Sequence, residues 1–169
     1  MGYTCGVACE PFLAPVNHDT LLSGCPRFPP HYISNVLERR EGYLRALRRH
    51  GILENYIEDS LLTREAVCDA TIRLLQRAPQ ITAIFACNDN VAIGAMNAAH
   101  DLGLSVPYDL SIMGFDNIDL AQDVRPSLTT VNVDKRMMGM LAVRYLLERL
   151  ENPSNTPLTT MLRASTQPV

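Results

Sequence analysis

Two pairs of polar residues follow two apolar runs of the sequence, and their types are suited to binding a ligand rich in hydroxyl groups. The pair Asn88–Asp89 comes directly after the apolar run Ile81–Cys87, and the pair Asp116–Asn117 comes directly after the run Leu110–Phe115. A carboxylate accepts hydrogen bonds from neighbouring hydroxyls, and an amide offers both a donor and an acceptor. This combination favours a sugar or a polyol as the ligand.

The elements around these pairs predict that both pairs lie at one place. Each apolar run is typical of a buried strand, and the pattern Val91–Met96 between them indicates a helix that Gly103 ends. A strand, a helix and a second strand with short joints form a βαβ unit with parallel strands. Because the carboxyl ends of such strands line the ligand crevice, both pairs should face it.

The rest of the chain continues this alternation. Residues 1–18 show no clear pattern, and the prolines of Cys25–His31 predict a loop. Further helices are expected over Asn35–Arg49, closed by Gly51, over the segment from the cap Thr63 to Arg77, and over Lys135–Glu151 after the cap Asp134. Further strands are expected at Asp19–Gly24, Tyr56–Ile57, Leu128–Val133 and Leu158–Arg163, with an irregular segment before Leu128. The fold class is therefore α/β, a Rossmann-like parallel sheet of about four to six strands with helices on both faces.

Composition narrows the class of protein. The 169 residues are 47% apolar and 20% charged, as in a globular domain, and the net charge of −3 gives no attraction to nucleic acid or membrane. No apolar run approaches the ~20 residues of a membrane helix, and no secretory signal is visible, which predicts a cytoplasmic protein. The five cysteines are irregularly spaced and the four histidines scattered, so we expect reduced thiols, no metal and no cofactor.

Two further patterns allow competing interpretations. The helix Asn35–Arg49 is basic at its end, which could indicate a nucleic-acid surface, but cations are also favoured at a helix C-terminus by the macrodipole. Asp89 and Asp116 could form a carboxylate pair for glycoside hydrolysis. The sequence has no nucleophile elbow, phosphate loop or His-Glu-x-x-His motif, and no histidine near the strand ends, so we expect no enzyme.

Each candidate residue also has a purely structural interpretation. Asp116 is either a ligand contact or a turn former, and Asp89 is either a ligand contact or the cap of a helix that starts at Asn90. Arg39 can offer a fork of hydrogen-bond donors to the same crevice, although alone it would be a solvated arginine.

Five motifs in order resemble the sensor domain of LacI/GalR-type transcriptional repressors. They are Glu38–Tyr43, Asn88–Met96, Val106–Asn117, Pro126–Val131 with Gly139 further on, and Leu162–Thr166. The resemblance covers about Asp19 to Thr166 and implies a type I periplasmic-binding-protein-like fold, in which two lobes hold an effector between them.

The resemblance also implies roles for individual positions. Arg39, Asn88 and Asp116 match positions that contact the effector in the family, and Ser60 matches one that is often aromatic. Serine there weakens the inference of a stacked sugar, and Val133 replaces a frequent glutamine. Five residues match the subunit interface of the family, with ordinary core packing as the alternative for the first two: Ile93, Met96, Gln122, Val124 and Arg125.

By the layout of the family, this chain is mostly the C-terminal lobe. Residues 1–18 remain unassigned, 19–130 form the C-terminal lobe, 131–157 form a crossover with a helix that would pack on the N-terminal lobe, and 158–169 form a closing strand and tail. No helix-turn-helix is recognisable, so we expect an N-terminally truncated form, from a truncated gene or a deliberately expressed domain, that binds no operator DNA by itself.

The sequence thus predicts the effector-sensing and dimerisation part of a LacI-type regulator. Its expected partners are a small carbohydrate-like effector, a second copy of the chain, and operator DNA only in the intact protein. The alternatives are the sugar-binding protein of an ABC-type transporter, which shares the fold, and a stand-alone α/β enzyme.

Overall fold

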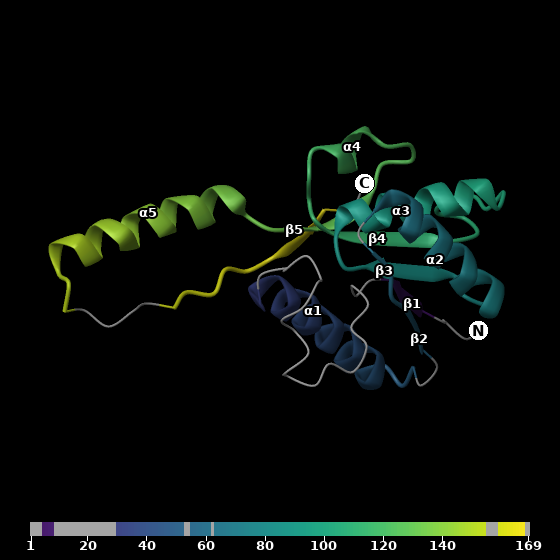
Figure 1. Cartoon of the computed structure of the whole chain (residues 1–169), viewed down its shortest axis with the longest axis horizontal. Helices are drawn as coiled ribbons and strands as arrows, with labels where there is room; N and C mark the ends of the chain where they lie inside the picture. The colour runs from purple at the N-terminus through teal and green to yellow at the C-terminus, as the bar shows by residue number, and fades with distance from the viewer. Residues whose placement is uncertain (1–4, 9–29, 53–54, 62, 155–158, 168–169) are drawn as a thin grey trace, which may run out of the picture.

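The protein is built around a six-stranded sheet with the strand order β2-β1-β3-β4-β5-β6. Figure 1 shows this sheet with helices packed against it. The computed structural model describes residues 5–8, 30–52, 55–61, 63–154 and 159–167. Neighbouring strands are parallel except β6, which is antiparallel to β5. The strands are β1 (Cys5–Ala8), β2 (Asn55–Glu58), β3 (Ala83–Ala86), β4 (Ser111–Asp116), β5 (Thr129–Asn132) and β6 (Ser165–Gln167).

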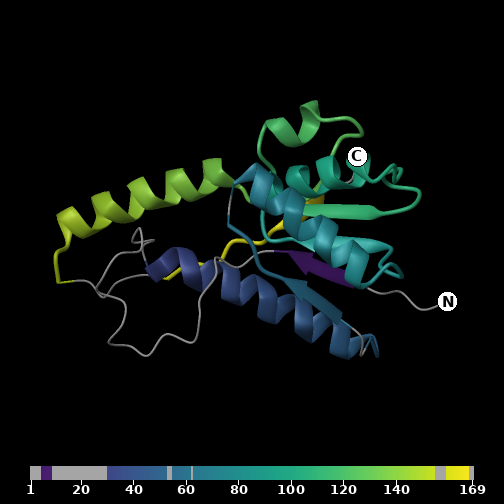
Figure 2. The ribbon, with the colours of Figure 1, turned by 45° about the vertical axis from the view of Figure 1, so that its right-hand side comes forward.

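Helices cover both faces of the sheet, as predicted. They are α1 (Pro30–Arg49), α2 (Arg64–Arg77), α3 (Asp89–Asp101), α4 (Leu120–Asp123) and α5 (Lys135–Glu151). From β1 the chain adds β2 at one edge of the sheet, and it then crosses back to add β3 and β4 on the other side of β1. Since parallel crossovers are right-handed, α1 lies on one face while α2 and α3 lie on the other (Figure 2).

The side chains of β3 show how this sheet is buried from both sides. Ile84 and Ala86 belong to the main core cluster with α2 and α3. Phe85 points to the opposite face, where its ring stacks on Tyr43 of α1 with 5.9 Å between the ring centroids. Alternate residues of a strand face opposite sides, so a short apolar strand can serve two helical layers.

The predicted helix ends are confirmed at several positions. The side chains of Thr63 and Asp134 accept hydrogen bonds from the third backbone N–H after each of them. Gly51 has a φ of +71°, and the N–H of Ile52 donates to the carbonyl of Leu47 across it. Helices commonly end in this way because glycine adopts a left-handed conformation without steric cost.

Four features differ from the sequence-based expectation. β1 forms inside the stretch 1–18 that could not be placed, and α1 already begins at Pro30, because proline is tolerated in the first helical turn. The irregular segment before Leu128 contains the short helix α4. The last strand is Ser165–Gln167 rather than Leu158–Arg163. The strand expected at Asp19–Gly24 lies outside the described residues.

The strand order reverses at β1, which is flanked by β2 and β3. In open parallel sheets a ligand crevice forms outside the carboxyl ends of the strands at such a switch point. The residues that follow β3, Cys87 and Asn88, therefore lie at the expected place for a binding site.

Candidate functional site

The central feature of the candidate site is a contact between Arg39 and Asp116. Nη2 of Arg39 lies 2.9 Å from Oδ1 of Asp116, and Nη1 donates to the carbonyl oxygen of Cys87 at 2.6 Å. The side chains of Arg39 and Asp116 are 22% and 31% exposed, so both charged groups remain reachable from solvent. A helix on one face of the sheet is thus joined to the ends of β3 and β4.

The guanidinium of Arg39 is also held in place by an aromatic ring. Its Cζ lies 3.9 Å from the centroid of the Phe115 ring, a cation–π contact. With two hydrogen bonds and this stacking, the planar group is oriented before any ligand arrives. Such preorganisation reduces the entropy lost on binding.

Asn88 serves as the N-cap of α3, and the helix begins at Asp89 rather than at Asn90 as expected. Oδ1 of Asn88 accepts a hydrogen bond from the N–H of Val91 at 3.0 Å. This bond uses the side-chain oxygen and not the Nδ2 amide, which can donate hydrogen bonds of its own. Asn88 follows directly on Cys87, whose carbonyl binds Arg39, so the structure brings the regions of Arg39, Asn88 and Asp116 together.

Asp89 is placed differently from these residues. Its side chain is 1% exposed, Oδ2 accepts from the N–H of Ile118 at 2.8 Å, and Oδ1 accepts from the Thr130 hydroxyl at 2.5 Å. Both carboxylate oxygens are therefore used inside the protein. Direct ligand contact by Asp89, one of the two expected roles, does not fit this burial, and the alternative role as helix cap belongs to Asn88.

Ser60 lies in the loop after β2 and is 7% exposed. Its hydroxyl donates to the carbonyl of Leu61 at 3.0 Å. A contact of Ser60 with an effector stays a prediction.

Two polar residues of this region, Asn132 and Lys135, were not singled out from the sequence, and both contact Asn117 of the predicted polar pair. The Nδ2 of Asn117 donates to Oδ1 of Asn132 at 3.0 Å, and Nζ of Lys135 donates to the carbonyl of Asn117 at 2.8 Å. They surround the turn after β4 from β5 and from the first turn of α5. Asn132 lies within the β-prone run Leu128–Val133 and Lys135 follows the helix cap Asp134, and these are the sequence signals that could have indicated them.

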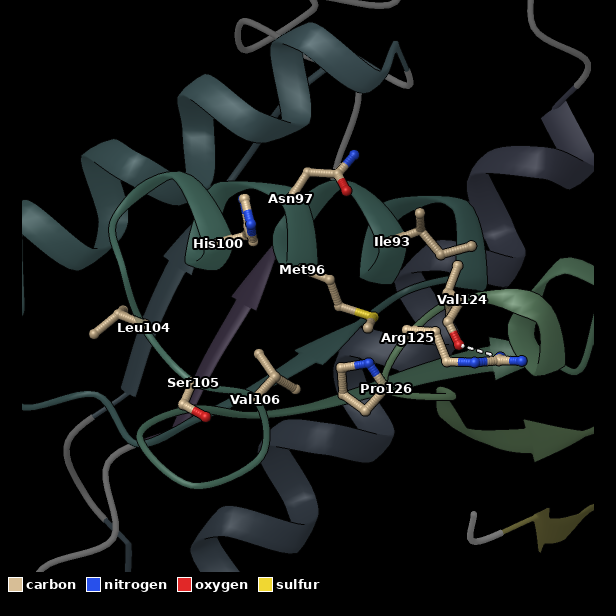
Figure 3. Close-up of a pocket in the computed structure, with 10 residues that line it drawn as sticks. All are labelled: Ile93, Met96, Asn97, His100, Leu104, Ser105, Val106, Val124, Arg125 and Pro126. Carbon is tan, nitrogen blue, oxygen red and sulfur yellow. Dashed lines mark hydrogen bonds between the residues drawn. The ribbon is translucent and has the colours of Figure 1, made fainter.

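Four of the five residues expected at a subunit interface line a groove of about 530 Å³ along α3, and Figure 3 shows them. Ile93 and Met96 contribute to this groove although they are only 5% and 8% exposed, so they also belong to the core. Val124 and Arg125 line the opposite side, whereas Gln122 is exposed on α4. Ile93 and Met96 therefore fulfil the core-packing interpretation, and their interface role stays a prediction.

Two other kinds of site are absent from the described ranges. In that part of the chain no three or more side chains of His, Cys, Asp or Glu gather closely enough to hold a metal ion. None of its helices combines the length and the apolar composition needed to cross a bilayer.

A parallel sheet with opposed helical layers and a polar site at its carboxyl edge defines a periplasmic-binding-protein-like sensor domain, and comparison with known proteins agrees. Residues 29–167 match the family model described as periplasmic binding protein-like domain. The chain belongs to this family, within the group formed by the sensor domains of LacI-type transcriptional regulators.

Curated relatives of the chain are repressors. It is 39% identical over 126 residues to the ribose operon repressor of Haemophilus influenzae, covering 73% of this chain and 38% of that protein. It is 43% identical over 115 residues to the transcriptional repressor CytR of Escherichia coli, covering 67% of this chain and 34% of that protein. The chain thus spans little more than a third of the length of these relatives.

Solved structures show the same fold. A LacI family regulator from Enterococcus faecium with bound ribose superposes with a TM-score of 0.77 at 26% identity, over 98% of this chain and 54% of that one. The regulator CelR in complex with cellobiose gives a TM-score of 0.69 at 28% identity, over 78% of this chain and 41% of that one.

Proposed function

We propose that this chain is the effector-sensing and dimer-forming part of a LacI-type transcriptional regulator, and that its effector is a small carbohydrate. The observation that carries the proposal is the contact between Arg39 and Asp116 at the carboxyl ends of β3 and β4. It places a fork of donors beside a partly exposed carboxylate acceptor. A sugar presents hydroxyl groups that both donate and accept, so it can satisfy both groups at once.

The nature of the relatives supports a regulator over a transport protein. The curated relatives are repressors, and solved neighbours hold ribose or cellobiose. We propose DNA binding for the whole regulator and not for this part of it. A regulator of this kind acts on DNA, so we also propose that the protein is cytoplasmic. The relatives are transcriptional regulators, which supports a sensing role rather than catalysis.

Ligand-induced stabilisation tests the binding site. Ribose and cellobiose should be compared as probes by thermal unfolding and by calorimetric titration, because a ligand that binds only the folded state raises its stability. Asp116→Ala should abolish the thermal shift while circular dichroism shows an intact fold. Asp119→Ala is the matched control, since that carboxylate is exposed and its side chain makes no capping hydrogen bond to α4. An unchanged shift in Asp116→Ala would remove this residue from the site.

We propose the groove along α3 as the surface through which two copies associate. Val124 is half-buried at its edge, and Arg125 and His100 add polar atoms at the rim. Val124→Glu should convert the dimer into a monomer, as measured by sedimentation velocity, because an unpaired charge would be buried at the interface. Val143→Glu on α5 is the matched control for the second apolar surface of the protein. Dissociation by Val143→Glu alone would assign the interface to α5 instead.

We also propose that residues 131–157 form the crossover between two lobes, with α5 packing on an N-terminal lobe in the longer proteins of this family. In the described structure α5 has no buried residue, although it carries Met140, Val143, Leu146, Leu147 and Leu150. Apolar surface of this extent is typical of a helix that contacts another protein surface.

A further inference from the structure

The turn that presents Asp116 has an unusual backbone. Asp116 has a φ of 106° and the following Asn117 has a φ of 50°, both in the left-handed region that favours glycine. Asn and Asp adopt a φ near 50° more readily than other non-glycine residues, but a φ of 106° lies outside that range and persists only where the surroundings hold it. Two of them in succession require an explanation in the neighbouring contacts.

The turn also changes the direction of the Asp116 side chain. In a regular strand Asp116 would face the same side as Gly114, which is the side of α3. Its carboxylate instead meets Arg39 of α1, the helix on the other face. The conformation of the turn therefore decides whether Asp116 reaches the proposed ligand site.

The buried carboxylate of Asp89 holds this turn from the α3 side. It accepts a hydrogen bond from the N–H of Ile118, two residues after Asp116. It also accepts from the hydroxyl of Thr130, and that hydroxyl in turn accepts from the N–H of Asn117 at 3.4 Å. One carboxylate thus fixes two successive N–H groups of the turn, one directly and one through Thr130.

The surroundings of Asp89 are adapted to keep this carboxylate in place. A Cβ on Gly114 would lie 2.2 Å from its Oδ1, so glycine at 114 makes the room it occupies. Thr130 is 1% exposed, so water has little access to this contact. A buried charge is tolerated only with hydrogen-bond partners, and the N-terminus of α3 adds a favourable dipole.

We infer that Asp89 is a positioning residue of the ligand site: it fixes the left-handed turn and thereby holds the Asp116 carboxylate against Arg39. This inference rests on the proposed sugar-binding function of that pair. It gives Asp89 a role that helix capping does not need, because Asn88 already caps α3. It also connects the first turn of α3 directly to the ligand site.

The experiment compares isosteric variants in the intact chain with ribose as the probe. Asp89→Asn keeps the size of the side chain, but its amide NH₂ would face one of the two groups that donate to Asp89, the N–H of Ile118 or the hydroxyl of Thr130. Thr130→Val removes the bridging hydroxyl, and Thr130→Ser restores it as the conservative rescue. We expect ribose to bind about ten- to a hundredfold more weakly to the first two variants, the loss of a charged hydrogen bond, and nearly normally to Thr130→Ser.

A second readout needs no ligand. Amide hydrogen exchange of Asn117 and Ile118 should be about tenfold faster in Asp89→Asn and Thr130→Val, and the carboxyl carbon resonance of Asp116 should move, while the α2 amides stay unchanged. If Asp89→Asn does not fold, the comparison of Thr130→Val with Thr130→Ser carries the test.

The outcomes separate this inference from the proposed function. If the turn signals change in Asp89→Asn and Thr130→Val while the wild-type protein binds no sugar, the positioning role is supported and the proposed ligand class is rejected. Normal ribose binding by folded Asp89→Asn and Thr130→Val, with unchanged turn signals, would overturn the positioning role and leave the sensor function intact.

Discussion

The helices α3 and α5 begin with the same kind of cap, but α3 is mostly buried and α5 is not. Each starts with a side-chain cap, Asn88 for α3 and Asp134 for α5, that accepts from the third N–H after it. Nine of the 13 residues of α3 are buried, whereas none of the 17 residues of α5 is. Figure 1 shows α3 against the sheet and α5 extending away from it. Local sequence signals are therefore enough to define a helix, but only a packing partner stabilises its apolar side chains.

The largest difference between the two helices should appear when a valine is shortened. Val91 of α3 is 1% exposed and Val143 of α5 is 59% exposed. Val91→Ala should lower the free energy of unfolding by about 2–3 kcal/mol, because it loses buried apolar area and leaves a cavity. Val143→Ala should change it by less than about 0.5 kcal/mol, as for an exposed site. Chemical denaturation measures both, and equal losses would mean that α5 is covered in solution.

Glycine replacements should change stability in opposite directions. A Cβ on Gly94 of α3 would lie 2.7 Å from Cγ1 of Val67 in α2, whereas nothing lies within 4 Å of one on Gly139 of α5. Gly94→Ala should cost about 1–2 kcal/mol through overpacking. Gly139→Ala should increase helix stability by about 0.5–1 kcal/mol, since alanine restricts the unfolded chain.

Thermal and chemical unfolding of the two alanine variants distinguish these cases. The comparison fails if Gly94→Ala is as stable as the wild type, because α2 and α3 would then be further apart than the structure shows. A destabilising Gly139→Ala would indicate that another surface approaches α5 closely.

Removing the helix caps should lower stability by less, and the loss should be global for α3 but local for α5. Asn88→Ala should lower the global free energy of unfolding by about 1 kcal/mol, because α3 unfolds together with the core. Asp134→Ala should mainly reduce the helical signal of α5, since an unpacked helix of this length is marginally stable in water. Hydrogen exchange resolved by residue measures both, and a global loss in Asp134→Ala would show that α5 unfolds with the sheet.

The smallest expected effect is on the pKa of the Cys68 thiol, where α2 meets the end of α3. Burial raises the pKa of the Cys68 thiol, and the charges of Asp101 and Asp69 raise it further. A raised pKa leaves less thiolate at a given pH, so alkylation should accelerate only at higher pH. Asp101→Asn should shift this profile to lower pH, and Asp109→Asn should not. Alkylation followed by mass spectrometry of the Cys68 peptide gives the profile, and identical profiles would show that Asp101 is too distant to act.

The positions of the strand ends could be predicted because their chemistry is local. The apolar runs before Asn88 and Asp116 form β3 and β4, and both strands are parallel neighbours in the sheet. The resemblance to LacI-type sensors added Arg39, which no local pattern indicates. Its contact with Asp116 joins positions 77 residues apart.

The sequence could not show that two adjacent polar residues, Asn88 and Asp89, have different roles. Asn88 and Asp89 are adjacent and both polar, but Asn88 is partly exposed and caps α3, whereas Asp89 is buried under the turn after β4. The strand β1 was missed because a four-residue segment has too little pattern to distinguish it from a loop.

The sequence by itself determined the alternation of strands and helices, the caps Thr63 and Asp134 and the polar character of the strand ends, because each depends on residues close together in the chain. Only the tertiary structure decided which polar group meets which, and which apolar helix face is covered. Asp89 accepts from groups 29 and 41 residues away, and such contacts depend on the register of β4 and β5 rather than on any local preference.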